Sequence, residues 1–483
     1  MRSRVTRHFD GLFATETPVA VSASRALSVV RATEPKRVLL PREFSWHDYA
    51  VYLLHVAAEI EHSLMVQYLY AAYSIGGPDV PRKEQPAVLE WQQTILGIAK
   101  EEMGHFLTVQ NVLRLIGGGL NLDREDFPWD IPFFPFPFRL ERLSRKSLAK
   151  YVFAESPTEW PADVTSAERK EIEAAAGSTP ENIPHRVGEL YELMIEVLGN
   201  QEALADSVFR TETVPFQASW DEWGRSYDGT GRGATAQGPS PNVIVRRVSS
   251  RSDAVSVLED IARQGEWPQE DPSAQEESHF RRFLSIFRAF PKSEKGSWSP
   301  TWAVATNPQA PGVTSPDSGP VIQHPEASTW STLFNIRYRM LLAYLSHSFR
   351  LSSEALEVGA ASPRGMIISR TFGEMYNLRS TAGILVQLPL VNDKNPERAG
   401  PPFQMPYTVK LPPEEADCWR VHLDLIDAAS ALLEELSKLP TGPRADYATA
   451  LLNSDKRAQI EIHKLLGSSR RSAPQPARRS LAL

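Results

Sequence analysis

Residues 95–116, which read ILGIAKEEMGHFLTVQNVLRLI, decide the fold of this protein. The stretch contains no proline and is followed by three glycines at 117–119, so it predicts a long α-helix with a defined end. One set of positions recurs at alternating steps of three and four residues, which places the set on one face of the helix. These positions are Ile95, Ile98, Glu102, His105, Val109, Val112 and Ile116. A glutamate and a histidine three residues apart are therefore expected to point into an apolar core.

A second stretch, from Gln275 to Phe290, repeats this pattern. Its inward positions also step by three and four residues, and they are Glu276, His279, Phe283, Ile286 and Phe290. We therefore expect a second Glu-x-x-His pair on the buried face of a second helix.

Two further predicted helices each add a single acid. Residues 46–75 form a long stretch without proline in which Glu61 lies on the apolar stripe. The short connection to the helix at 87–116 predicts an antiparallel hairpin. In a third helix, predicted over 183–200, Glu189 lies on the stripe, although Glu192 competes for the inward position.

Four buried carboxylates without partners would destabilise a core strongly, so they need a common explanation. Two divalent cations supply it, because four glutamates and two neutral histidines balance their charge and are ligands that iron or manganese accepts. One Glu from each of two helices and a Glu-x-x-His from each of two others is the ligand pattern of ferritin-like bundles. The predicted metal ligands, which would also be the catalytic residues, are Glu61, Glu102, His105, Glu189, Glu276 and His279.

Other nearby residues leave alternatives open. A single Glu-x-x-His is common by chance, and such residues are often simply hydrogen-bonded. Glu266 could replace or supplement Glu276, and His62 could support a ligand. Three acids fall off the stripes and are interpreted as solvated or as neighbours of the ligands: Glu59, Glu101 and Glu277. Three histidines without a partner at ligand spacing are interpreted as structural: His55, His324 and His347. Tyr68 and Tyr191 are candidates for pocket or redox-active residues, with core packing as the preferred interpretation.

The whole chain reads as mainly α. We expect an N-terminal arm at 1–45, partly disordered, a ferritin-like four-helix bundle at 46–295, a helical region packed on it at 296–466, and a basic disordered tail at 467–483. Further helices are predicted near 253–265, 329–351, 366–388 and 412–438. The Phe- and Pro-rich segment 127–138 is expected to wall a pocket at the metal site.

Composition limits the classes of function. The 483 residues carry a net charge of -7, which argues against nucleic acid as a partner. The single cysteine, Cys418, excludes a disulfide framework. No stretch is long and apolar enough for a membrane span, and no secretory signal is apparent, so a cytoplasmic protein without membrane contact is expected. The expected partners are a small-molecule substrate, an electron donor if the protein is an oxygenase, and a second copy in a homodimer.

Four segments resemble the ferritin-like domain of the iminophenyl-pyruvate dimer synthase family, here as a stand-alone unit. They are AAEIEHSLMVQYLYAAYSI (57–75), ILGIAKEEMGHFLTVQNVLRLIGG (95–118), VGELYELM (187–194) and EESHFRRF (276–283). The resemblance extends from about Trp46 to Tyr407 and implies the same six ligands. One departure is RQGEW at 263–267, where a more glycine-rich QGEG is expected. Members of this family join two amino-acid-derived imines in violacein- and rebeccamycin-type biosynthesis.

These observations predict a non-haem di-iron oxidase or oxygenase, with iron and manganese together as a variant of the metal pair and O₂ as co-substrate. Its substrate is expected to be a small amino-acid derivative in secondary metabolism. One alternative is the oxidative coupling of amino-acid-derived imines, as the resemblance implies. Another is a metal-binding storage or scaffold protein without catalysis.

Overall fold

The computed structural model describes residues 40–129, 136–157, 159–177, 186–224, 242–265, 277–291, 298–312, 318–354 and 362–472. These residues form helices and a few isolated β-bridges, which confirms the predicted mainly α class. The chain divides into two compact units, Met1–Trp302 and Ala303–Leu483. The expected arm, up to residue 39, lies outside the described residues.

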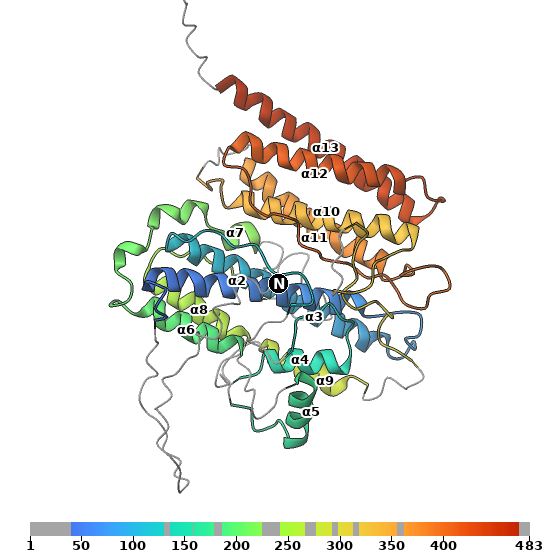
Figure 1. Cartoon of the computed structure of the whole chain (residues 1–483), viewed down its shortest axis with the longest axis horizontal. Coiled ribbons are helices and arrows are strands. Elements are labelled where there is room, and N and C mark those ends of the chain that lie inside the picture. Colours follow the sequence, from blue (N-terminus) through green and yellow to red (C-terminus); the bar gives the residue numbers. More distant parts are fainter. Residues whose placement is uncertain are drawn as a thin grey trace, which may run out of the picture. The chain divides into compact units, whose positions relative to one another are not determined.

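The two longest helices of the first unit are α2 (Trp46–Ser74) and α3 (Gln85–Leu115), which lie side by side (Figure 1). Their ends confirm the predicted antiparallel hairpin. His47 Nε2 contacts the carbonyl of Ile116 at 2.6 Å, and Gln92 Nε2 donates to the carbonyl of Ala72 at 2.9 Å. Gly76 follows α2 with a φ of 103°, a conformation that glycine adopts without a Cβ clash.

Two more helices complete a four-helix bundle. Helix α6 (Val187–Gly199) packs on α8 (Arg251–Gly265), and α2 packs on α6. Both α6 and α8 lie close to the predicted positions. Five smaller helical elements join them: α4 (Arg145–Ala154), α5 (Ser166–Ala176), α7 (Trp220–Trp223), η2 (Asp206–Val208) and η3 (Thr211–Phe216). The predicted helices did not include α4 or α5, which are short and begin with capping boxes at Ser144 and Thr165.

Helix α9 (His279–Ala289) begins later than predicted. The Ser278 hydroxyl accepts from the backbone N–H of Arg281 and so caps the first turn. Glu276 precedes this cap and lies outside the described residues. The structure therefore places His279 in the first turn of α9, and the predicted pairing of Glu276 with it on one helix face stays a prediction.

An irregular segment, 242–248, lies along α3 and is held there by hydrogen bonds from side chains of this helix. The Thr108 hydroxyl donates to the carbonyl of Ile244 at 2.9 Å, and Asn111 Nδ2 donates to the carbonyl of Arg246 at 2.9 Å. A Cβ on Gly104 would come within 2.8 Å of Val243 Cγ1 and 3.0 Å of the Ile244 backbone nitrogen. A glycine at position 104 therefore allows this close contact.

The ends of the Phe- and Pro-rich segment pair with each other. The backbones of Trp129 and Phe138 exchange hydrogen bonds of 3.0 and 2.8 Å, and their rings pack edge to face. The Phe136 ring packs on Phe153 of α4. Residues 130–135 lie outside the described residues.

The described residues of the second unit form four long helices: α10 (Pro325–Ser348), α11 (Pro363–Leu385), α12 (Glu415–Leu436) and α13 (Pro443–Ser472). The first three confirm predicted helices. Helix α10 packs on α11 and α12, and α12 packs on α13. Helix α13 was not predicted as an element and extends into the segment expected to be a tail, of which 473–483 lie outside the described residues.

A buried ion network joins three helices of the second unit. The Arg337 guanidinium contacts Glu374 of α11 at 3.2 Å and both carboxylate oxygens of Asp455 of α13. Arg337 itself is fully buried. The network therefore holds α11 and α13 to α10 through charges without access to water.

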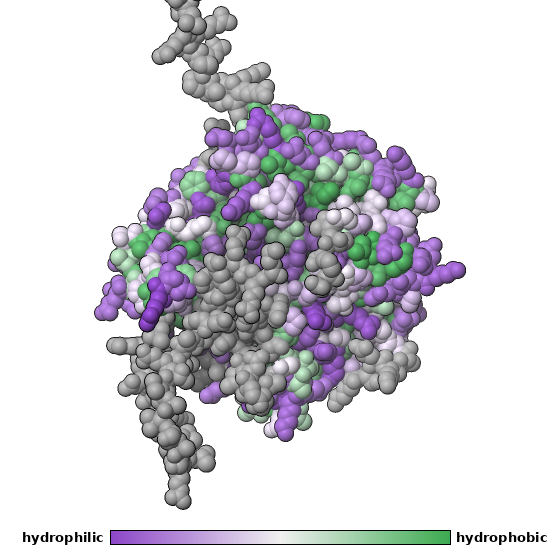
Figure 2. All heavy atoms as spheres, in the orientation of Figure 1, coloured by the Kyte–Doolittle hydropathy of each residue, from purple (hydrophilic) through white to green (hydrophobic). Residues whose placement is uncertain are grey.

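None of the helices in the described ranges has the length and hydrophobicity that crossing a membrane requires. The face of the molecule in Figure 2 mixes hydrophilic and hydrophobic residues.

Candidate metal centre

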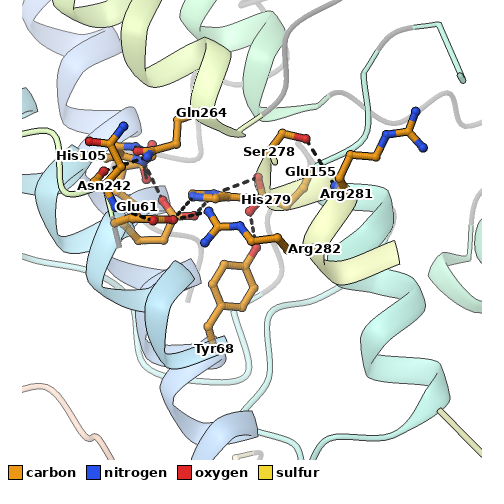
Figure 3. Close-up of polar contacts among 12 residues, drawn as sticks. Glu61, Tyr68, His105, Glu155, Asn242, Gln264, Ser278, His279, Arg281 and Arg282 are labelled. Atoms are coloured by element: carbon orange, nitrogen blue, oxygen red, sulfur yellow. Dashed lines mark hydrogen bonds and ion pairs between the residues drawn. The ribbon is translucent and has the colours of Figure 1, made fainter. Parts of the chain in front are cut away.

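Five buried side chains meet inside the first unit. Glu61 comes from α2, His105 from α3 and Glu155 from the end of α4, while His279 begins α9 (Figure 3). The fifth side chain, Glu102, also comes from α3. Each is exposed by 2% or less. They form two groups that share Glu102, and within each group the ligand atoms lie within 4.8 Å of one another.

Glu102 lies between the two histidines. Its Oε2 is 2.8 Å from His105 Nδ1, and its Oε1 is 2.9 Å from His279 Nδ1. Glu61 Oε2 lies 3.5 Å from His105 Nδ1, and Glu155 Oε2 lies 3.7 Å from His279 Nδ1. Each oxygen of Glu102 therefore faces one imidazole, and each imidazole faces one further carboxylate.

The far nitrogen of each imidazole has its own acceptor. His105 Nε2 lies 2.8 Å from Gln264 Oε1, and His279 Nε2 lies 3.0 Å from Glu101 Oε2. Because both partners are acceptors, each Nε2 carries a hydrogen. Histidines that bind metals commonly donate one N–H outward in this way and leave the other nitrogen for the ion.

Two tyrosines orient the outer carboxylates. The hydroxyl of Tyr191 donates to Glu61 Oε1 at 2.5 Å, and that of Tyr68 donates to Glu155 Oε1 at 2.5 Å. In both carboxylates, Oε2 is the oxygen that remains facing a histidine. Both tyrosines are buried in the core, as the preferred interpretation expects, and both also contact the cluster through their hydroxyl groups.

Burial and the neighbouring charges shift the pKa values of the cluster. Burial, followed by the charge of Glu102, raises the pKa of Glu61 to about 8. Burial alone would raise the pKa of Glu102 and lower that of His105, but their mutual attraction outweighs it. The pKa of Glu102 is held well below its ordinary value, with His279 contributing most, and that of His105 rises to about 10. The cluster therefore attracts positive charge strongly.

These residues fit divalent cations. Glu61 Oε2 and His279 Nδ1 are buried, and their contacts to His105 and Glu102 are ion-pair contacts without hydrogen-bond geometry within the described part of the chain. Carboxylate oxygen and imidazole nitrogen are suitable donors for iron or manganese. A cavity of about 10 Å³ borders the cluster, which is about the space of one water molecule.

The structure brings together four of the six predicted ligands. Glu189 is not among them: it is partly exposed, and α6 instead lines the cavity with Val187, Gly188 and Tyr191. Glu192 is exposed. A ligand role for Glu189 stays a prediction. Glu276 and Glu266 lie outside the described residues.

Three further acids are buried at or near the cluster. Glu155 was missed because it follows a short helix, where a stripe argument has no periodic pattern to use. Glu101 is buried and ion-paired with His279 and Arg282. Of the two interpretations, a solvated acid or a neighbour of the ligands, the structure therefore agrees with the second. Glu59 is buried and accepts from Asn121 Nδ2 at 3.1 Å. None of the described residues of the Phe- and Pro-rich segment lines the cavity.

His62 has its ring against Phe106 at 5.0 Å and belongs to neither ligand group among the described residues. His55 Nε2 contacts the carbonyl of Gly119 at 3.1 Å, and His324 caps α10 through Ala327. These contacts agree with structural roles for His55 and His324.

A further group of ligand-type side chains lies in the second unit. His347 Nε2 is 3.0 Å from Glu415 Oε1, and Cys418 lies near both. The other nitrogen of His347 contacts His422 at 2.9 Å, so the partners of His347 lie far from it in the sequence and not at ligand spacing. Arg350 Nη1 lies 3.1 Å from Cys418 Sγ. This positive charge makes the group less suited to a cation than the cluster in the first unit.

Comparison with known proteins finds a matching family and a relative. Residues 54–288, which contain all five side chains, match the family called Ferritin-like. Over 409 residues the chain is 26% identical to dichlorochromopyrrolate synthase of Lentzea aerocolonigenes, an alignment that covers 78% of this chain and 38% of that relative. The chain thus spans well under half of that relative's length.

No solved structure shows a significant match. The relative is a member of the iminophenyl-pyruvate dimer synthase-like family, so the resemblance seen in the sequence is confirmed. The match to the Ferritin-like family therefore covers the part of the chain that contains the cluster.

Proposed function

We propose that the first unit binds two iron ions and that the protein is an O₂-dependent non-haem oxidoreductase. Its proposed substrate is a small amino-acid derivative in secondary metabolism. The arrangement of Glu102 carries this proposal, because each of its oxygens faces a different histidine. One ion would be held by Glu61, Glu102 and His105, and the other by Glu102, Glu155 and His279. The same donors accept manganese, so a mixed pair is a variant of the proposal.

A bound iron pair would supply the electrons that reduce O₂, and the chain's own residues prepare the site for it. Tyr191 and Tyr68 bind one oxygen of Glu61 and Glu155 and leave the other oxygen free for a cation. Burial of the five side chains keeps bulk water away, which strengthens electrostatic interactions and limits side reactions.

Similarity to a synthase and the ferritin-like domain support an oxidative biosynthetic enzyme. A second candidate is the oxidative coupling of two amino-acid-derived imines, which the family resemblance favours. That reaction needs space for two substrate molecules, whereas oxidation of a single molecule needs space for one. The cavity of about 10 Å³ among the described residues is smaller than either, and residues 178–185 and 266–276, which adjoin its lining in sequence, lie outside the described part. Coupling is the second proposal because it rests on the family resemblance, whereas the proposed metal pair rests on the geometry of the cluster.

Metal content per chain tests the proposal first. The full chain is purified from iron-supplemented cells and compared with Glu102→Ala/His105→Ala. Glu59→Gln serves as the matched control, because Glu59 is buried on α2 but belongs to neither group. We expect about two irons in the wild type and in Glu59→Gln, and loss of iron in the double variant. Absence of metal from the wild type, also after anaerobic reconstitution, would contradict the proposal.

Oxygen consumption distinguishes an enzyme from a storage or scaffold protein. The iron-loaded protein is screened with amino acids, with keto acids, and with the imines that the keto acids form with ammonia. Uptake of O₂ that depends on one of these compounds supports the oxidoreductase. A dimeric product would favour coupling over oxidation of a single molecule. Iron that is bound and released without substrate-dependent uptake would instead indicate storage.

A further inference from the structure

We propose that the two ion positions are unequal and that Glu101 makes the position at His279 the tighter one. This inference rests on the proposed function, because it assumes that the cluster binds two cations. It concerns residues that lie outside the two ligand groups.

The difference begins at the far nitrogens of the two histidines. His279 Nε2 faces a carboxylate oxygen of Glu101 at 3.0 Å, whereas His105 Nε2 faces the neutral amide oxygen of Gln264 at 2.8 Å. A carboxylate accepts an N–H more strongly than an amide does. The imidazole that donates to a carboxylate becomes more basic at its other nitrogen and so binds a metal more tightly. The Nδ1 atom of His279 is therefore the stronger donor.

Glu101 is fixed in this role by further contacts. It is 1% exposed, its Oε1 accepts from the backbone N–H of Asn242 at 2.9 Å, and its Oε2 contacts Arg282 Nη2. The guanidinium stabilises the charged carboxylate but also shares the oxygen that accepts from His279. The expected gain therefore lies near the lower end of the roughly 10- to 100-fold range for such supporting contacts.

A hydrogen bond also fixes the orientation of the Gln264 amide beside His105. Its Nε2 donates to the carbonyl of Asn242 at 2.7 Å, so its Oε1 is the atom turned toward His105. The backbone of Asn242 thus binds Gln264 through its carbonyl (Figure 3) and Glu101 through its N–H. The backbone of one residue therefore orients both the carboxylate at His279 and the amide at His105.

Titration of the metal-free full chain with Mn²⁺ or Co²⁺, followed by calorimetry, tests this inference. We expect two binding steps, of which His279→Gln removes the tighter one and His105→Gln the weaker one. Glu101→Gln, which replaces the carboxylate with an amide like that of Gln264, should weaken the tighter step about 10-fold and leave the other step unchanged. In Gln264→Glu the weaker step should tighten. The visible absorption of bound Co²⁺ should change with Glu101→Gln at the tighter step, and thermal unfolding of the metal-free variants checks that they fold.

The outcomes separate the inference from the proposed function. Binding of no cation, or of only one, would overturn the proposed dinuclear centre and the inference with it. Two cations bound with equal affinity would overturn the inference alone. Equal weakening of both steps in Glu101→Gln, or a lower melting temperature with both steps intact, would assign Glu101 a structural role and also overturn it.

Discussion

The hydroxyl of Tyr191 lies 2.5 Å from Glu61 Oε1, so α6 reaches the cluster on α2 and α3 through a tyrosine. The contact leaves Glu61 Oε2 facing His105. Tyr191 is fully buried, and burial raises its pKa well above the ordinary value, with the charge of Glu61 adding to the effect. The hydroxyl therefore keeps its proton and acts as a donor.

Tyr191→Phe should lower the affinity for a divalent cation about 10-fold, because Glu61 loses the hydrogen bond that orients it. Calorimetric titration with Mn²⁺ measures the change. Tyr49→Phe is the matched control, since Tyr49 is also a buried tyrosine of the first unit and its hydroxyl makes no hydrogen bond with the described residues. An equal loss of affinity in both variants would show that the hydroxyl contact to Glu61 has no special role.

Cation binding should release protons and tighten as the pH rises from 6 to 8. In the metal-free protein the pKa of Glu61 is about 8 and that of His105 is about 10. Both groups therefore hold a proton near pH 7 that a cation must displace. Calorimetry in two buffers with different ionisation enthalpies counts the released protons. Affinity that falls as the pH rises would contradict this prediction.

The same protonation affects the stability of the metal-free protein. The folded-state pKa of His105 is raised above the ordinary 6.5. Its contribution to stability is therefore fully present below about pH 6.5 and is lost as the pH rises toward 10. Urea unfolding of the chelator-treated protein between pH 6 and 9 should give a falling midpoint. The metal-loaded protein should not show this decrease, because its cations replace the protons.

Gly104→Ala should destabilise the first unit by about 1–3 kcal/mol, because the new methyl group would overlap the segment 242–248. Since Asn242 belongs to this segment, cation affinity should also fall. Gly97→Ala is a control on the same helix, where a Cβ would meet only Arg282 Nη1, at 3.9 Å. That change should stabilise the protein by about 0.5–1 kcal/mol. Thermal unfolding of the two variants should shift in opposite directions.

Arg337→Ala should destabilise the second unit by about 3–5 kcal/mol, because it leaves Glu374 and Asp455 buried without their cation. Arg420→Ala removes an exposed ion pair to Asp417 and should cost less than about 1 kcal/mol. Denaturant unfolding monitored by circular dichroism compares the two. Similar midpoints would indicate that the buried network contributes little to stability.

The long helices could be predicted because their signals are local. Proline-free stripes and glycine stops define α2 and α3, and both helices match the prediction within about two residues. Glu61, Glu102 and His105 followed from the same periodicity. The start of α9 was predicted too early, because the spacing of three and four residues continues backward from His279 to Glu276. In the structure the Ser278 side chain caps the N-terminus, so the helix begins at His279.

Local sequence patterns are sufficient to predict a mainly helical chain with acids and histidines on apolar helix faces. They do not reveal that Glu155 joins the cluster, that Tyr68 and Tyr191 bind its carboxylates, or that Gln264 and Glu101 hold its histidines. The physical reason is that helical periodicity acts over a few residues, whereas these contacts join residues that are 87, 130, 159 and 178 positions apart. Partners at such separations are set by how the helices pack, which no local pattern encodes.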